Sequence, residues 1–153
     1  MPSLSETMSD VHIPSFDRQL HDNYHSTDYI CQNFRIQPGV WPAEFSDFLR
    51  VNGWNDFAFI TAYNPYSSQL LSQAENIKQH HQLLDVLSKS GLTFLPATGE
   101  DREGKWPAEA GVFLFNAGLE PALQLGAFFK QNAILWGTCT TPPEILWTHG
   151  KLR

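Results

Sequence analysis

Polar side chains that could bind a ligand are concentrated in four short segments between residues 61 and 133. The segments are 61–65 (TAYNP), 72–76 (SQAEN), 99–109 (GEDREGKWPAE) and 131–133 (QNA). Their Asn and Gln amides donate and accept hydrogen bonds, which suits a nucleobase or amide edge, and their Trp and Tyr rings can stack on a planar group. The candidate ligand-binding residues are Thr61, Tyr63, Asn64, Asn76, Asp101, Trp106, Glu109, Gln131 and Asn132.

The carboxylates of these segments allow a second interpretation. Asp101, Glu109 and Glu75 could hold Mg²⁺ or serve as a general base. The N-terminus of a helix predicted from residue 73 could bind a phosphate through its unpaired N–H groups. Neither a P-loop nor a GxGxxG pattern is present, so the common nucleotide-binding motifs are absent.

Each segment also has a purely structural interpretation. Ser72 and Glu75 have the spacing of a capping box, Asn64 precedes a proline in a turn pattern, and Trp106 could cover the end of a sheet. We favour a ligand contact for Trp106 and Asn132, and the capping role for Glu75.

Histidine and cysteine do not indicate a metal site. His21 and His25 have i, i+4 spacing and His80 is followed by His81, but no further ligand at zinc spacing completes either pair. The two cysteines, Cys31 and Cys139, form no CxxC motif and are expected to be reduced thiols of a cytoplasmic protein. Cys139 has no neighbouring base, which disfavours a nucleophilic role.

Length and composition indicate a single domain. The chain has 153 residues, 42% of them hydrophobic, which is enough to form a core. We expect a flexible leader at 1–13 and one domain at 14–153. The net charge of −6 disfavours general nucleic-acid binding, and no apolar run is long enough to predict a membrane span. The first residues lack the pattern of a secretory signal.

Hydrophobic periodicity predicts alternating strands and helices. Strands are expected at 28–36, 57–62, 92–95, 112–115, 133–136 and 145–147, and a polar loop at 98–109. Helices are expected from Pro14 to about Tyr24, from Pro42 to Asn52, and at 73–90 and 121–130.

The order of these elements predicts the fold class. From residue 57 it is β-α-β-β-α-β, the split βαβ order of ferredoxin-like sheets, preceded by an N-terminal β-α extension. We therefore expect an α+β protein with a largely antiparallel sheet and helices on one face. That topology brings all four polar segments to the same end of the sheet, where binding sites commonly lie.

The four segments, taken in this order, resemble the bacterial domain-of-unknown-function family 3293, whose members are small cytosolic proteins. The resemblance covers about residues 24–137 and includes a weaker segment with Tyr24, Thr27 and Tyr29. Two positions depart from the family pattern. The basic residue expected after Glu75-Asn76 has its nearest equivalent in Lys78, and Ala110-Gly111 replaces a usual serine. The resemblance supports the fold and the site but implies no activity.

Three functions are compatible with these observations. The first is a binding or regulatory module for a small polar or nucleotide-like ligand, which we favour because the polar segments converge. The second is a carboxylate-based enzyme that uses the 100–109 loop, with or without Mg²⁺. The third is a protein-interaction domain, suggested by five Trp in a short chain. Oligomeric state is not predicted.

Overall fold

The computed structural model describes residues 18–67 and 70–148. The predicted leader at 1–13 and the beginning of the first predicted helix lie outside the described residues. The helices are α1 Arg18–His25, α2 Ala43–Val51, α3 Gln73–Ser90 and α4 Leu119–Phe128, with a 3₁₀ turn η2 at Pro65–Ser67. The strands are β1 Thr27–Cys31, β2 Phe34–Ile36, β3 Asp56–Thr61, β4 Thr93–Asp101, β5 Glu109–Phe115, β6 Ala133–Thr138 and β7 Thr141–Trp147.

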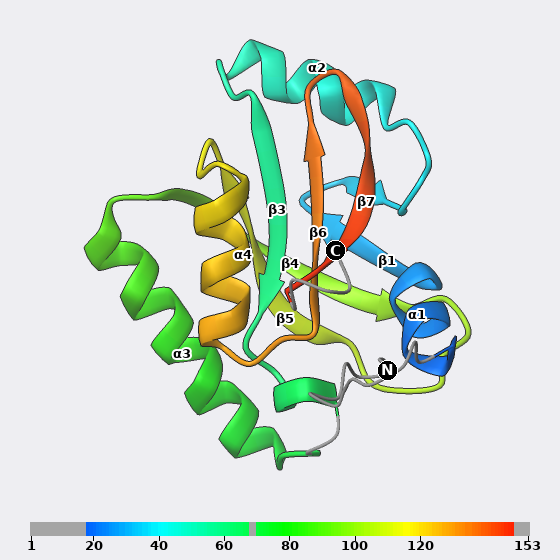
Figure 1. Ribbon diagram of the computed structural model, residues 1–153, viewed down its shortest axis with the longest axis vertical. Helices are drawn as coiled ribbons and strands as arrows, with labels where there is room; N and C mark the ends of the chain where they lie inside the picture. The colour runs from blue at the N-terminus through cyan, green and yellow to red at the C-terminus, as the bar shows by residue number, and fades with distance from the viewer. Residues whose placement is uncertain (1–17, 68–69, 149–153) are drawn as a thin grey trace, which may run out of the picture.

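The seven strands form one sheet in the order β2-β1-β4-β5-β3-β6-β7, and each neighbouring pair is antiparallel. The predicted α+β class with a largely antiparallel sheet is therefore confirmed. Figure 1 shows α3 and α4 on one side of the sheet and α2 on the other side. The expectation that all helices cover one face is wrong, because α2 buries an apolar face of its own against the opposite side.

Strand β3 explains why both faces of the sheet are covered. Its apolar run is continuous, and successive side chains point to opposite faces. Phe57 and Phe59 join the core formed with α2, whereas Ala58 and Ile60 join the core formed with α3 and α4. A strand with one polar face would need no second layer of helices.

Helix α3 has the ends predicted from its sequence. Ser72 accepts a hydrogen bond from the backbone N–H of Glu75, and the Glu75 carboxylate accepts one from the backbone N–H of Ser72, which completes a capping box. Gly91 ends the helix in the left-handed conformation with φ of 75°.

Two segments differ from the predicted elements. The single strand expected at 28–36 is a hairpin of β1 and β2, which reverses direction at Gln32, a residue with φ of 54°. The expected 98–109 loop is shorter, because β4 continues past Pro96 to Asp101 and β5 begins at Glu109. Pro96 lies opposite Val112 of β5, whereas the pairing of β4 with β1 covers Thr98 to Asp101. The missing N–H of the proline therefore interrupts no pairing with β1.

The end of β3, the β4–β5 loop and the beginning of β6 lie together at one end of the sheet (Figure 1). Helix α1 lies beside this end, where the Tyr24 ring meets Trp147 edge to face. None of the helices in the described ranges is long and apolar enough to cross a membrane.

Candidate functional site

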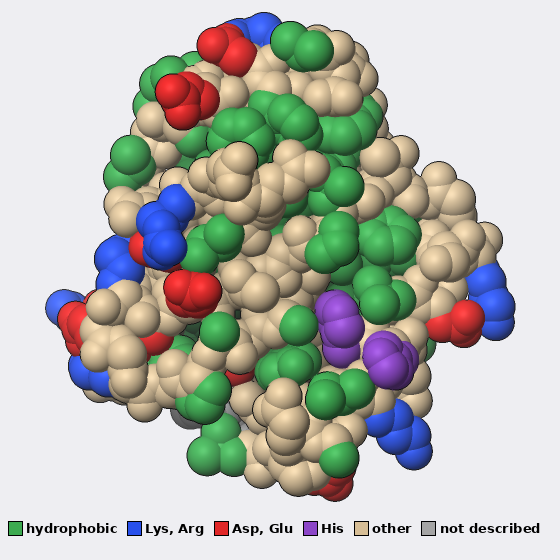
Figure 2. Space-filling view, turned by 180° about the vertical axis from the view of Figure 1, so that it is seen from behind, with side chains coloured by type: hydrophobic (Ala, Val, Ile, Leu, Met, Phe, Trp, Pro, Cys, Tyr) green, Lys and Arg blue, Asp and Glu red, His purple; other side chains and the backbone are tan. Residues whose placement is uncertain are grey.

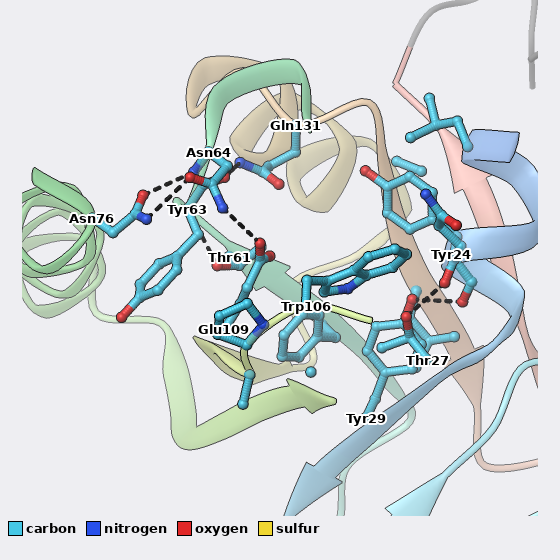
Figure 3. A pocket seen from close by; sticks show the side chains of 18 of the residues that line it. Tyr24, Thr27, Tyr29, Thr61, Tyr63, Asn64, Asn76, Trp106, Glu109 and Gln131 are labelled. Atoms are coloured by element: carbon cyan, nitrogen blue, oxygen red, sulfur yellow. Dashed lines mark hydrogen bonds between the residues drawn. The ribbon is translucent and has the colours of Figure 1, made fainter. Parts of the chain in front are cut away.

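A pocket of about 690 Å³ opens at this end of the sheet. Its walls come from α1, β1, the segment between β3 and α3, the β4–β5 loop and the beginning of β6 (Figure 3). Its polar and aromatic lining residues include Tyr24, Thr27, Tyr29, Phe59, Thr61, Tyr63, Asn64, Asn76, Lys105, Trp106, Glu109 and Gln131. A pocket built from elements so far apart in the chain exists only in the folded protein.

The floor of the pocket is apolar and aromatic. Phe59 and Tyr29 lie with their ring centroids 5.0 Å apart, and Ala133 and Leu135 complete the surface. The Phe59 ring lies directly against Gly111, where a Cβ atom would come within 2.7 Å of the ring. The glycine therefore permits the close approach of the ring to β5.

Asn64 and Asn76 form a reciprocal pair at the upper wall. The backbone N–H of Asn64 donates to Asn76 Oδ1 at 2.9 Å, and Asn76 Nδ2 donates to Asn64 Oδ1 at 3.0 Å. The same Asn64 oxygen accepts from the backbone N–H of Leu71 at 3.0 Å. These bonds hold the segment between β3 and α3, and they fix which end of the Asn64 amide is oxygen.

Glu109 is the one carboxylate that residues 18–67 and 70–148 contribute to the lining. Its Oε2 accepts a hydrogen bond of 2.9 Å from Asn64 Nδ2, and burial raises the pKa of the carboxyl while this bond opposes the change. Within the described ranges Asn64 is its hydrogen-bond partner, and Oε1 has none. In Figure 3 the carboxyl group lies between Asn64 and Trp106. A partly desolvated carboxylate with an unused oxygen can accept a hydrogen bond from a bound molecule.

Gln131 is buried and its amide is also fixed in orientation. Nε2 donates to the backbone carbonyls of Tyr63 at 3.0 Å and Phe129 at 3.2 Å. Because both partners are acceptors, the nitrogen must face them and Oε1 must face the other way, on the pocket side in Figure 3.

Thr61 and Tyr63 support the pocket wall from within the protein. Thr61 Oγ1 donates to the backbone oxygen of Ala110 at 2.6 Å and accepts from the backbone N–H of Tyr63 at 3.2 Å. The Tyr63 ring turns toward α3, where it meets His80 edge to face. Both residues line the pocket, but the hydrogen bonds of Thr61 are made to backbone groups of the protein and serve its structure.

Two of the nine candidate residues lie outside the lining, and the other seven line it. Asp101 accepts from the backbone N–H groups of Glu103 at 3.2 Å and Lys105 at 2.7 Å, so it shapes the β4–β5 turn. Asn132 is buried and donates to the backbone oxygen of Tyr66 at 2.8 Å. The structure therefore gives both side chains contacts within the protein, and the ligand contact expected for Asn132 stays a prediction.

The pocket also contains residues that were not among the candidates. Tyr24, Thr27 and Tyr29 form the wall beside α1, and Lys105 lies beside Trp106 in the β4–β5 loop. The first three belong to the weakly similar segment of the family resemblance, which was the available signal. Their position depends on the pairing of β1 with β4, and periodicity does not predict this pairing.

The structure gives little support for a phosphate site at the N-terminus of α3 or for a metal site. The capping box places the Glu75 carboxylate at the N-terminus of α3, which makes that end unfavourable for a phosphate. Among residues 18–67 and 70–148, no three His, Cys, Asp or Glu side chains gather to hold a metal ion. Cys31 is a buried free thiol and Cys139 a half-buried one.

Part of the chain matches a known protein family. A family described as a protein of unknown function (DUF3293) matches residues 60–134, which confirms the resemblance inferred from the four segments. The matched region runs from β3 to the beginning of β6 and includes all nine candidate residues. Neither the curated proteins nor the solved structures include a significant match to this chain.

Proposed function

We propose that the protein is a binding or regulatory module that holds a small polar or nucleotide-like ligand in this pocket. The observation that carries the proposal is the Glu109 carboxyl, which is oriented by Asn64 and keeps one oxygen unbonded above an aromatic floor. Its pKa is raised by burial, and a perturbed carboxyl in a concave pocket is a feature of functional sites.

The size and surface of the pocket suit a ligand with a planar ring. About 690 Å³ falls within the range of small-molecule sites. The half-buried Trp106 ring is a surface on which a planar ring can stack, and the buried Phe59 contributes to the apolar floor. Among the described lining residues Lys105 is the one cation, and its ammonium group pairs with Glu103 at 2.7 Å. It could instead meet a phosphate carried by the ligand at the pocket mouth.

An enzyme is the second candidate, and Glu109 also favours it. A carboxylate with a raised pKa can serve as a general base toward a molecule in the pocket. A mechanism that uses two carboxylates has less support. Asp101 accepts a hydrogen bond from the backbone of the β4–β5 turn and does not line the pocket. Turnover of a ligand identified by binding would favour this candidate.

A protein-interaction surface is the third candidate. Figure 2 shows hydrophobic side chains across the middle of one face, with charged side chains mainly toward its periphery. Of the five Trp, Trp41 is exposed and the other four are half-buried. The exposed apolar residues come from separate elements, among them Trp41, Val51 and Phe128. We rank a protein-interaction function below ligand binding, because the pocket brings oriented polar groups together.

We propose that the protein acts in the cytoplasm of a bacterium without binding nucleic acid generally or a membrane. We also propose that β3-α3-β4-β5-α4-β6 is a ferredoxin-like core. The sheet order β4-β5-β3-β6 and the packing of α3 and α4 on the same face support that proposal.

The proposed function is tested by ligand-induced stabilisation. The wild-type protein is melted with bases, nucleosides, nucleotides and small amides, and positive compounds are titrated by calorimetry. We expect at least one compound to raise the Tm and to lose this effect in Trp106→Ala and Glu109→Gln. Trp41→Ala and Glu144→Gln, which change exposed residues outside the lining, should keep it. No stabilisation by any compound of the panel would contradict the proposal.

A further inference from the structure

We infer that the pocket selects a planar heterocycle that carries an exocyclic amino group, such as an aminopyrimidine or aminopurine base. This inference rests on the proposed function and names the chemical class of its ligand. It follows from the hydrogen-bonding direction of two side chains in the lining, Glu109 and Gln131, whose orientations are fixed by other contacts.

Glu109 presents a hydrogen-bond acceptor to the pocket. Its carboxylate cannot rotate away without losing the hydrogen bond from Asn64. Asn64 Oδ1 is held by Leu71 N–H and Asn76 Nδ2, each at 3.0 Å, so the Asn64 nitrogen must face the carboxylate. That nitrogen holds Oε2 at 2.9 Å. The remaining oxygen is therefore presented at a defined place, and it favours an N–H donor on the ligand.

Gln131 offers a second acceptor from another element. Its amide nitrogen donates hydrogen bonds to two backbone carbonyls, so Oε1 is directed toward the pocket. Turning the amide over would bring its oxygen against the carbonyls of Tyr63 and Phe129, which is unfavourable. Two oriented acceptors suit a ligand edge with N–H groups.

Donors are also available, which favours a heterocycle over a simple amine. In the described chain, the indole N–H of Trp106 and the second amide hydrogen of Asn64 have no assigned partner. A ring such as cytosine or guanine presents an amino group beside acceptor atoms, and so matches both kinds of group. A free carboxylate or phosphate presents acceptors alone and would meet Glu109 unfavourably in the pocket.

The inference is tested with ligand pairs that differ in the amino group. Wild-type protein is titrated by calorimetry with cytidine against uridine and guanosine against inosine. We expect the amino-bearing member of at least one pair to bind about tenfold more tightly or better, as one charge-assisted hydrogen bond allows. Glu109→Gln should remove or reverse this ratio, because its oxygen would accept from Asn64 and its NH₂ would face the pocket. Glu144→Gln is the control and should preserve the ratio.

The outcomes separate this inference from the proposed function. Equal affinity for both members of each pair would overturn the inference while leaving a ligand-binding protein. Absence of binding by every compound of the wider panel would overturn both. If Glu109→Gln fails to fold, the wild-type protein at lower pH provides the second measurement. Protonation of Glu109 should then weaken binding of the amino-bearing ligand, and a pH-independent ratio would count against the inference.

Discussion

Asn64 donates a hydrogen bond of 2.9 Å to Glu109 across 45 positions of sequence, and so joins the end of β3 to the beginning of β5. The bond orients the Glu109 carboxylate in the pocket. It also links that carboxylate to α3, because Asn64 shares two hydrogen bonds with Asn76. Pocket geometry and local stability therefore depend on the same side chain.

Replacing Asn64 should destabilise the protein. Asn64→Ala removes three side-chain hydrogen bonds and places alanine at φ of 43°, a conformation that asparagine and glycine adopt more readily. We expect the free energy of unfolding to fall by about 2–4 kcal/mol. Urea unfolding with Asn64→Gly as the comparison separates the two causes, since glycine also lacks the three side-chain hydrogen bonds but adopts this conformation without strain. If both variants matched the wild type, the network would have no stabilising role.

Glu109 should give the protein a pH dependence that a glutamine variant lacks. Burial raises the pKa of this carboxyl above its usual value of 4.5, so the folded protein keeps the proton to higher pH than the unfolded chain. Stability from this group is present at low pH and is lost as the pH rises above about 4.5. We expect Glu109→Gln to gain stability relative to the wild type between about pH 4 and about pH 7, measured by urea unfolding. A difference between Glu109→Gln and the wild type that stays constant across this pH range would contradict the prediction.

Asp28 should have the opposite pH dependence. Burial opposes ionisation of Asp28, but hydrogen bonds from Arg102, Arg35 and Gln37 outweigh it and lower the pKa below 3.8. Its contribution to stability is therefore present above about pH 4 and is lost as the pH falls through the lowered pKa.

Asp28→Asn should reduce the free energy of unfolding at neutral pH by about 1–3 kcal/mol, because both arginines are partly exposed and regain water. Asp47→Asn breaks an exposed pair with Arg50 and should cost less than about 1 kcal/mol. Chemical denaturation at neutral pH checks both values. Equal losses in the two variants would show that burial of Asp28 is unimportant.

Gly111 should not tolerate a side chain. A Cβ atom there would lie 2.6 Å from the backbone oxygen of Ile60 and 2.7 Å from the Phe59 ring, so the backbone or the pocket floor must move. We expect Gly111→Ala to lose about 1–3 kcal/mol of stability in a thermal or urea melt. Gly99→Ala is the matched change in the adjacent strand, where the nearest atom is 3.4 Å away and little loss is expected. A Gly111→Ala variant as stable as Gly99→Ala would be inconsistent with this packing.

The two thiols should differ in reactivity. Burial raises the pKa of the Cys31 thiol to about 11, so almost no thiolate forms near neutral pH, and the side chain is inaccessible. Cys139 is half-buried and should react alone with a thiol reagent in the native protein. Mass spectrometry before and after denaturation counts the modified thiols, with Cys139→Ser as the control. Rapid native labelling of Cys31 would contradict its burial.

Local sequence patterns determined much of the secondary structure and the placement of the candidate segments. The S-x-x-E spacing and Gly91 predict both ends of α3, and the apolar run of β3 predicts a strand buried on both sides. Such features depend on hydrogen bonds and side-chain periodicity within a few residues. The element order then predicts that Asn64, Glu109 and Gln131 lie near one another, and they do.

Tertiary contacts decided which of these polar groups remain available to a ligand. Asp101 and Asn132 belong to the same segments as Glu109 and Gln131, yet their partners are backbone groups of a turn and of Tyr66. The wall formed by Tyr24 and Tyr29 depends on β1 pairing with β4, more than 65 positions away. A polar side chain is free for a ligand only when no distant part of the chain satisfies it. That condition is set by the folded arrangement, because hydrogen-bond partners far apart in sequence leave no local pattern.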